Sequence, residues 1–275
     1  MLRMTGRRRN TPRRLPAAER PAVPILMYHE ISPDCPEVFR KYVVSPQAFA
    51  RQMQWLANNG YTPIGFSTLR ANRIGQQALP RRPVVITFDD GYQDCVQHAG
   101  AVLQRHGFGA VMFPVAGLIG QPSRWLMREL GFERPLAGWA ELRAFADAGS
   151  EIGGHTWSHP RLCAVHPDEA RYELATSRDV LEQSLGRPVV HLAYPFGSVN
   201  ATVRTLAAET GYSTACTTEI GVSASGEDLL MLRRVPITGH DSLMDFVCRV
   251  RTGLTVVQAA KALARRTQEM VASWV

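Results

Sequence analysis

Short apolar runs alternate with longer amphipathic stretches from residue 24 to about residue 250, and this alternation limits what the chain can fold into. The runs at 83–88 and 109–116 enclose a stretch at 94–107 whose apolar residues recur at helical spacing. Strands that alternate with helices of this length pair in parallel through right-handed crossovers. The sequence therefore predicts an α/β fold, either a barrel or an open doubly wound sheet.

The expected elements can be placed from periodicity and from residues that mark helix ends. Strands are expected at 24–29, 83–88, 109–116, 150–154, 188–195 and 212–218. Helices are expected at 45–60, 94–107, 138–149, 167–186 and 201–211. Ser45 followed by Pro46 is typical of a helix start, and Asp94 is expected to cap the helix that follows it.

The composition fits one globular domain with a charged extension. The 275 residues are 45% hydrophobic and 20% charged, which suffices for one large core. Much of the net charge of +7 lies in the arginines of segment 1–23, which we expect to be disordered because it has almost no bulky apolar residues. We expect a barrel domain at 24–250 and a C-terminal helix at 251–275 that packs on the barrel or mediates contacts.

Partners and compartment are constrained by what the sequence lacks. The arginine-rich tail is expected to solubilise the chain; it could also bind nucleic acid or an anionic membrane, and no other nucleic-acid partner is expected. No apolar stretch of signal-peptide or membrane-span length occurs, which predicts a cytoplasmic protein without a transmembrane segment. Five widely spaced cysteines without a CxxC pair argue against disulfides and against a thiolate zinc site.

Two adjacent carboxylates, Asp89 and Asp90, follow the apolar run "VVITF". Side chains at the carboxyl ends of parallel strands are where α/β folds place their functional groups. Two carboxylates this close repel each other, so one should be protonated unless a cation is present. Gly91 would let the backbone turn sharply and direct both side chains into one pocket, although Asp and Gly are also ordinary turn residues.

A pair of histidines, His155 and His159, follows the short strand expected at 150–154. On one helical turn, positions i and i+4 lie on the same face, so both imidazoles could bind one ion, and Pro160 would end the turn. Neutral imidazole is a common ligand of zinc. One aspartate and two histidines leave coordination positions open, which is typical of a catalytic metal site. One carboxylate would then bind the ion, and the other would be free to act as a base.

Three motifs carry a family resemblance: "TFDDG" (87–91), "HTWSHP" (155–160) and "AYPFG" (193–197). Together they resemble the polysaccharide deacetylases of carbohydrate esterase family 4, which hydrolyse N-acetyl groups of glycans. The resemblance covers roughly residues 24–250 and implies a distorted (β/α) barrel with about seven strands. The implied metal ligands, usually of zinc, are Asp90, His155 and His159. The implied general base is Asp89. The implied oxyanion and substrate-binding turn consists of Pro195, Phe196 and Gly197.

The sequence departs from the family pattern in its third motif. The family often has an arginine that orients the base, whereas this sequence has Ala193 at that position, and Phe196 replaces a tyrosine. The tuning of Asp89 must therefore come from another part of the chain. The family's late strand that ends in a catalytic histidine is also missing, since His240 in "LRRVPITGH" lies beyond an expected turn.

His29 ends the first expected strand, much as a histidine ends the last strand of most family members. Because the termini of a barrel lie close together, an element can move from one end of the chain to the other. We hypothesise that the barrel is circularly permuted and that His29 protonates the leaving amine. In this the sequence resembles the subgroup that deacetylates poly-N-acetylglucosamine and related exopolysaccharides. A packed, hydrogen-bonded histidine is the alternative.

Aromatic residues could provide platforms for sugar rings, because an apolar sugar face packs on an aromatic ring. The candidates are Tyr28 and Trp125, the latter in a long loop expected at 117–137. Trp139 is expected to belong to the core because it lies in an amphipathic helix.

The motifs together predict a metal-dependent hydrolase that removes N-acetyl groups from an N-acetylhexosamine-containing polysaccharide or its oligosaccharides. The alternatives are a deacylase that acts on O-acetyl esters or small amides, and a catalytically inactive carbohydrate-binding relic. An exopolysaccharide substrate would imply association with the envelope, which conflicts with the missing export signal.

Overall fold

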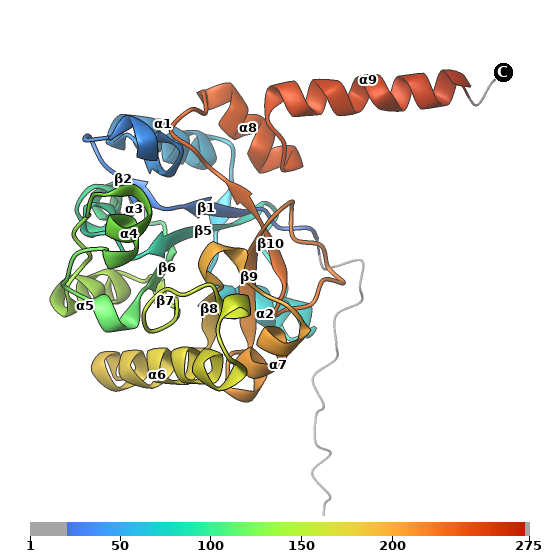
Figure 1. The fold of residues 1–275 in the computed structure, drawn as a ribbon. Helices are drawn as coiled ribbons and strands as arrows, with labels where there is room; N and C mark the ends of the chain where they lie inside the picture. Colours follow the sequence, from blue (N-terminus) through green and yellow to red (C-terminus); the bar gives the residue numbers. More distant parts are fainter. Residues whose placement is uncertain (1–20, 273–275) are drawn as a thin grey trace, which may run out of the picture.

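The computed structural model describes residues 21–272, with only the last residues of the predicted tail at 1–23 inside that range (Figure 1). Its strands are β1 (Ile25–Tyr28), β2 (Glu30–Ile31), β3 (Val43–Val44), β4 (Thr62–Pro63), β5 (Pro83–Asp90), β6 (Val111–Pro114), β7 (Glu151–Ile152), β8 (His191–Ala193), β9 (Thr214–Ile220) and β10 (Leu232–Pro236). Its α-helices are α1 (Pro46–Asn58), α2 (Phe66–Arg73), α3 (Gly100–His106), α4 (Arg124–Leu130), α5 (Trp139–Asp147), α6 (Pro167–Leu185), α7 (Ala201–Glu209), α8 (Leu243–Thr252) and α9 (Val256–Ala272). Its short helical turns are η2 (Glu37–Tyr42), η3 (Cys95–Ala99), η4 (Ala116–Leu118), η5 (Leu162–Ala164) and η6 (Pro195–Gly197).

Parallel strands form a nearly closed barrel in the order β7-β6-β5-β1-β10-β9-β8. The two ends of this order meet just beyond β7, where the Gly154 N–H donates to the His191 carbonyl at 2.8 Å. The Ala193 N–H in turn donates to the Gly154 carbonyl at 3.0 Å. The predicted seven-stranded α/β barrel is therefore confirmed. The strands follow one another around the barrel in chain order, which a permuted barrel would also show, so circular permutation stays a prediction.

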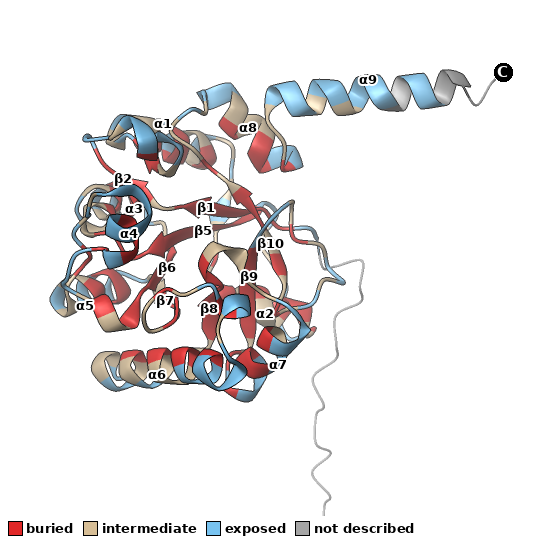
Figure 2. Cartoon of the chain, in the orientation of Figure 1, coloured by how far each residue is buried: buried red, intermediate tan, exposed pale blue. Residues whose placement is uncertain are grey.

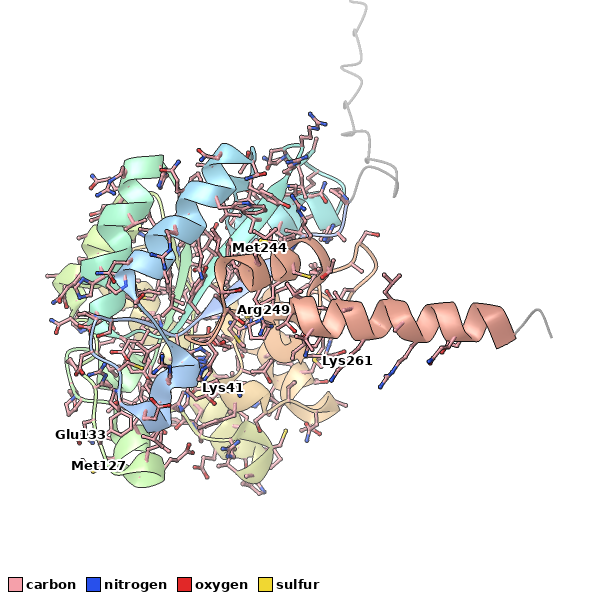
Figure 3. The ribbon with its side chains drawn as sticks, turned by 90° about the horizontal axis from the view of Figure 1, so that it is seen from above. Lys41, Met127, Glu133, Met244, Arg249 and Lys261 are labelled. Atoms are coloured by element: carbon pink, nitrogen blue, oxygen red, sulfur yellow. The ribbon has the colours of Figure 1, made fainter. Side chains whose placement is uncertain are left out.

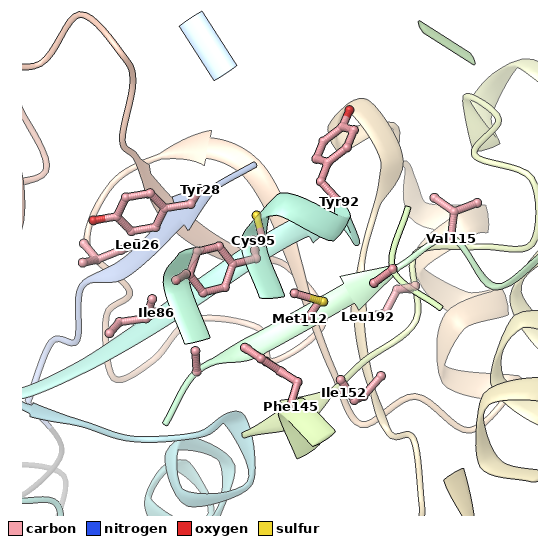
Figure 4. Close-up of a cluster of buried hydrophobic side chains, with 14 of the residues drawn as sticks. Leu26, Tyr28, Ile86, Tyr92, Cys95, Met112, Val115, Phe145, Ile152 and Leu192 are labelled. Carbon is pink, nitrogen blue, oxygen red and sulfur yellow. The ribbon is translucent and has the colours of Figure 1, made fainter. Parts of the chain in front are cut away.

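The barrel interior changes from apolar to polar along its axis. Its lower part is a small core that includes Val85, Val111 and Leu232, and α2 closes this end with Phe66 and Leu69. A second, larger core lies between the outer face of the strands and the surrounding helices, and Figure 4 shows part of it around Met112 and Phe145. The strands are buried almost throughout (Figure 2). Asp89, Asp90 and Arg234 lie toward the end where the strands finish, whereas His191 at the start of β8 packs against Phe66 and lies 2.6 Å from the Thr214 hydroxyl.

Some helix and strand ends lie where the sequence predicted them, and two predictions are wrong. Ser45 caps α1, accepting a hydrogen bond from the Ala48 N–H at 3.2 Å. Asp94 makes no such cap because its own backbone is helical, with φ −58° and ψ −30°, and the chain continues into the π-helical turn η3. Strand β10 was not expected, because two consecutive arginines, Arg233 and Arg234, are not typical of a buried strand.

The expected C-terminal helix is present as α9, which begins at Val256. Of the two roles expected for it, packing on the barrel is wrong. It leaves α8 and extends away from the body of the molecule (Figure 1). No helix in the part of the chain that the structure describes is long and apolar enough to cross a membrane.

Gly153 lies where β7 meets β8, and we expect Gly153→Ala to destabilise the barrel. An added Cβ would overlap the Phe113 ring and lie 2.8 Å from the His191 carbonyl oxygen. Overpacking of this kind costs about 1–3 kcal/mol of the free energy of unfolding, measurable by urea denaturation. Gly100→Ala is the matched control because nothing lies within 4 Å of its added Cβ, so it should be neutral or slightly stabilising. Equal effects of the two substitutions would contradict this view of barrel closure.

Candidate metal centre and catalytic site

The predicted site residues gather at the carboxyl ends of the barrel strands. Asp89 and Asp90 end β5, and His29 follows β1. Strands β1 and β5 pair in parallel through Tyr28 and Phe88, so the next pair in the same register sets His29 beside Asp89. The loop after β7 carries His155 and His159, and η6 follows β8. The fold thus brings together residues that are far apart in the sequence.

Asp90, His155 and His159 converge on one point. The Asp90 Oδ1 lies 3.2 Å from the Nε2 of each histidine, and one ligand atom from each residue lies within 4.8 Å of the others. All three side chains are buried. The sequence predicted this grouping, and the structure places it within the dimensions of a single metal site.

The orientation of His155 is set by the strand beside it. Its Nδ1 lies 2.7 Å from the Ala193 carbonyl oxygen, and because a carbonyl can only accept, Nδ1 carries the proton. The lone pair of a neutral ring is then on Nε2, which faces Asp90. A hydrogen bond of this kind from the remote ring nitrogen is typical of metal-binding histidines.

The charges and lone pairs of this cluster suit a divalent cation. Burial lowers the pKa of His159, although the hydrogen bond to Asp90 opposes that shift, so the ring is neutral at pH 7. Burial raises the pKa of Asp90, but interactions with the imidazoles of His155 and His159 outweigh burial and hold that pKa well below its usual range. Two imidazoles and a carboxylate form a nitrogen and oxygen donor set that fits zinc and other first-row divalent ions.

The two histidines meet through a tight turn, and the helical turn expected at 155–160 is wrong. Thr156 and His159 have φ values of 64° and 67°, in the left-handed region, and the Thr156 Oγ1 accepts a hydrogen bond from the His159 N–H at 3.0 Å. Glu173 of α6 fastens the same turn by accepting from the N–H groups of Trp157 and Ser158, both at 2.8 Å. Helical spacing was therefore a misleading signal for a correct pair.

Backbone strain is concentrated at this site. Among residues 21–272, the non-glycine residues with positive φ are Asp90, Thr156, His159 and Phe196. Such conformations are uncommon outside glycine and cluster at functional sites. Gly91 next to Asp90 has φ 79°, and a Cβ there would lie 2.8 Å from the Pro114 Cα, so the predicted need for glycine is confirmed.

Asp89 is bound by an arginine that the sequence did not identify. Arg234 of β10 donates from Nη1 to Oδ1 at 2.6 Å and from Nη2 to Oδ2 at 2.7 Å, and its Nε donates to the Thr217 carbonyl at 2.9 Å. Arg234 is fully buried. The group that tunes Asp89, which the sequence placed in another part of the chain, is therefore Arg234 of β10, and it stands in for the arginine that position 193 lacks.

Arg234 keeps Asp89 ionised. Burial raises the pKa of Asp89, but the charge and hydrogen bonds of Arg234 outweigh burial and leave that pKa below its ordinary value. The sequence did contain an indication that Arg234 faces the interior. Side chains alternate between the two faces of a strand, and Leu232 belongs to the interior core, so residue 234 must face the interior as well.

His29 lies close enough to the site for its pKa to respond to both carboxylates. Burial lowers the pKa of His29, and the charges of Asp89 and Asp90 oppose that shift. Its ring packs edge-on against Tyr42, with the ring centroids 4.9 Å apart. The imidazole is therefore neutral at pH 7, and once protonated it would give up its proton readily.

The turn η6 approaches the metal-ligand cluster from β8. The Phe196 ring lies 4.6 Å from the His159 ring, and the Arg161 guanidinium lies 3.8 Å above the outer face of Phe196. Phe196 has φ 58°, and the N–H of Gly197 closes the turn onto the Tyr194 carbonyl at 2.9 Å. A Cβ on Gly197 would overlap Thr218, so this turn is confined on both sides.

Neither proposed sugar platform is exposed. Tyr28 points away from the barrel interior into the outer core, where its hydroxyl donates to Gln52 Oε1 at 2.8 Å. Trp125 lies in helix α4, not in a loop, and is buried against His159 with the ring centroids 4.4 Å apart. Trp125 therefore contacts the site only by packing on the His159 imidazole, and neither Tyr28 nor Trp125 is a sugar platform.

Comparisons with known proteins agree with this geometry. A sequence profile described as Polysaccharide deacetylase matches residues 76–215. The Bacillus subtilis protein YxkH is 29% identical over 221 residues, covering 80% of this chain and 73% of that protein. The poly-beta-1,6-N-acetyl-D-glucosamine N-deacetylase of Escherichia coli K12 is 28% identical over 240 residues, covering 76% of this chain and 36% of that protein.

Solved structures share the fold. The Streptococcus pyogenes deacetylase PplD, in complex with acetate, superposes with a TM-score of 0.73 at 26% identity, covering 83% of this chain and 98% of that one. IcaB from Ammonifex degensii superposes with a TM-score of 0.69 at 23% identity, covering 79% and 92%.

Removing the partner of a buried charge should be costly, and we expect Arg234→Met to lower the free energy of unfolding by about 3–5 kcal/mol. The double variant Asp89→Asn/Arg234→Met should recover part of this loss because no buried charge remains uncompensated. Arg204→Met, which breaks an ion pair with Asp228 that is about 40% exposed on both sides, is the control and should cost less than about 1 kcal/mol. Urea denaturation would decide, and similar losses in the two single variants would contradict the role of Arg234.

Proposed function

The chain belongs to the polysaccharide deacetylase family, and we propose that it is a metal-dependent hydrolase that removes N-acetyl groups from an N-acetylhexosamine-containing polysaccharide, releasing acetate. The observation that carries the proposal is the convergence of Asp90, His155 and His159 beside a second, ion-paired carboxylate. Binding of a sugar would require no base next to a cation site. The arrangement therefore favours turnover over a carbohydrate-binding relic.

Asp90, His155 and His159 would hold the divalent ion, with zinc the ion we propose. When bound, such an ion supplies Lewis acidity toward an acyl carbonyl and lowers the pKa of water. Three protein ligands leave room for water and substrate. Trp125 packs on His159 and excludes solvent from that side of the ligand.

Asp89 would act as the general base by accepting a proton from the attacking water. Both of its oxygens accept from Arg234, yet each carboxylate oxygen has a second lone pair that can take a proton. Arg234 thus has two effects: it fixes the carboxylate plane and keeps Asp89 ionised, ready to accept. A lowered pKa also makes Asp89 a weak base. A weak base would suffice where the pKa of the attacking water is itself lowered.

His29 would donate a proton to the nitrogen of the leaving amine. Its lowered pKa means that the ring is neutral before the reaction, so it would first receive the proton that Asp89 has taken from water and would then pass that proton to the leaving nitrogen. The N–H of Phe196 would donate a hydrogen bond to the oxyanion that forms on the acetyl carbon. Pro195 and Gly197 would hold that N–H in place, since the turn is confined between Thr218 and the His159 ring.

An exopolysaccharide of the poly-N-acetylglucosamine type is the substrate that we propose. Support comes from the Escherichia coli relative, whose name specifies poly-beta-1,6-N-acetyl-D-glucosamine, although the chain spans only 36% of that protein. A substrate of this kind would place the working enzyme at the envelope.

Acetate release tests the activity directly. Purified protein loaded with zinc should release acetate from β-1,6-linked N-acetylglucosamine oligomers, and a chelator should abolish the release until zinc is restored. A chromogenic acetyl ester serves as the comparison. Hydrolysis of the ester without release from the oligomers would reject N-deacetylation in favour of an ester deacylase.

Metal content and turnover should respond differently to two substitutions. We expect His29→Ala to retain one equivalent of metal while acetate release falls by about 10²–10⁴-fold, the usual contribution of general acid catalysis. Asp90→Ala should lose both metal and turnover because it removes a ligand. His106→Ala at the end of α3 is the control and should resemble the unmodified protein. Loss of metal from His29→Ala, measured by elemental analysis, would refute the assigned role.

A further inference from the structure

Helix α9 projects from the body of the molecule. It leaves the barrel beyond α8 and extends away from it, as seen from two directions in Figure 1 and Figure 3. Its start is anchored, since the Asp245 Oδ1 accepts a hydrogen bond from the Val256 N–H at 3.2 Å. Thr255 and Gln258 cap it reciprocally, with the Gln258 Oε1 accepting from the Thr255 N–H at 2.9 Å. The helix is therefore held in this direction by α8.

One face of α9 is apolar without contributing to the fold. At 100° per residue, Val256, Val257, Ala260 and Ala264 fall on one side of the helix. Val256 and Val257 are 43% and 61% exposed, and neither hydrophobic core of the described residues includes any part of α9. Figure 2 shows the described part of α9 as mostly exposed around its circumference. An apolar face on a projecting helix requires a partner outside the barrel.

The side of α9 that adjoins this apolar face is basic. Lys261 and Arg265 lie on it, both exposed, and Glu269 is the single acidic residue within 256–272. Arg251 near the end of α8 adds a further positive charge, lying 5.6 Å from the Trp55 ring. Two copies of such a helix would bring like charges together, which opposes self-association. An anionic partner complements this charge.

We propose that α9 is a membrane-surface helix that binds anionic phospholipid headgroups. A helix with an apolar face and a polar face rich in Lys and Arg lies in the plane of the bilayer interface, with the valines inserted and the basic side chains at the headgroups. The helix does not have the apolarity to span the bilayer. The proposal is independent of the proposed deacetylase activity, because no residue of α9 belongs to the catalytic site.

Vesicle cosedimentation of the full chain tests this. The unmodified protein should bind vesicles of phosphatidylcholine that contain about 30% phosphatidylglycerol, an anionic lipid. It should not bind vesicles of phosphatidylcholine alone. Lys261→Glu/Arg265→Glu should bind roughly 25-fold more weakly or worse, since each basic residue near an anionic surface contributes about fivefold. Arg81→Glu/Arg105→Glu, an equal charge change at exposed sites elsewhere, should retain binding.

The isosteric pair Val256→Thr/Val257→Thr tests the apolar face, and its binding should fall by about fivefold or more because apolar insertion is lost. Acetate release from soluble oligomers reports folding and should be unchanged in all three variants. Three results would overturn the proposal: no sedimentation of the unmodified protein with anionic vesicles, binding that survives both α9 variants, or a dimer in solution that Val256→Thr/Val257→Thr abolishes while vesicle binding is absent.

Discussion

Two adjacent carboxylates at the end of one buried strand constrain the rest of this structure. Asp89 and Asp90 are both buried, and two ionised carboxylates side by side in a medium of low polarity repel each other strongly. The fold resolves this by giving each carboxylate its own partners. Asp89 faces Arg234, while Asp90 turns out of the strand at φ 69° toward two imidazoles that suit a metal ion. Without this separation, one of the two carboxyls would be protonated.

The barrel supplies what this separation needs. Arg234 is 145 residues from Asp89 in the chain, yet β10 and β5 both flank β1, so the interior brings them together. The apolar lower half of the interior, closed by α2, keeps water from the ion pair and strengthens it. Asp89 is consequently tuned from across the barrel, and the motif that contains it need carry no arginine of its own.

The sequence predicted the parts of the site that depend on short-range pattern. Gly91 and the ligands Asp90, His155 and His159 could be identified because their residue types and spacing point to one chemistry. The alternation along β10 marks Arg234 as facing inward, but its pairing with Asp89 depends on strand register between distant segments and was missed. Tyr28 was misjudged because its face of β1 follows from packing. The turn at 155–160 was misread for a further reason: four-residue spacing fits both a helix and a strained turn, and only Glu173, on another helix, selects the turn.

The strain at the site indicates how the proposed metal ligands are held in place. Positive φ at four non-glycine residues costs on the order of 1 kcal/mol or more each, a sizeable share of the net stability of a domain. This cost is sustained by contacts from surrounding elements: Glu173 fastens the histidine turn, Trp125 packs on His159, and Arg161 covers Phe196. These contacts come from three separate segments, so relaxing the strain would require breaking several of them together. The geometry of the proposed ligands therefore depends on the folded barrel as a whole.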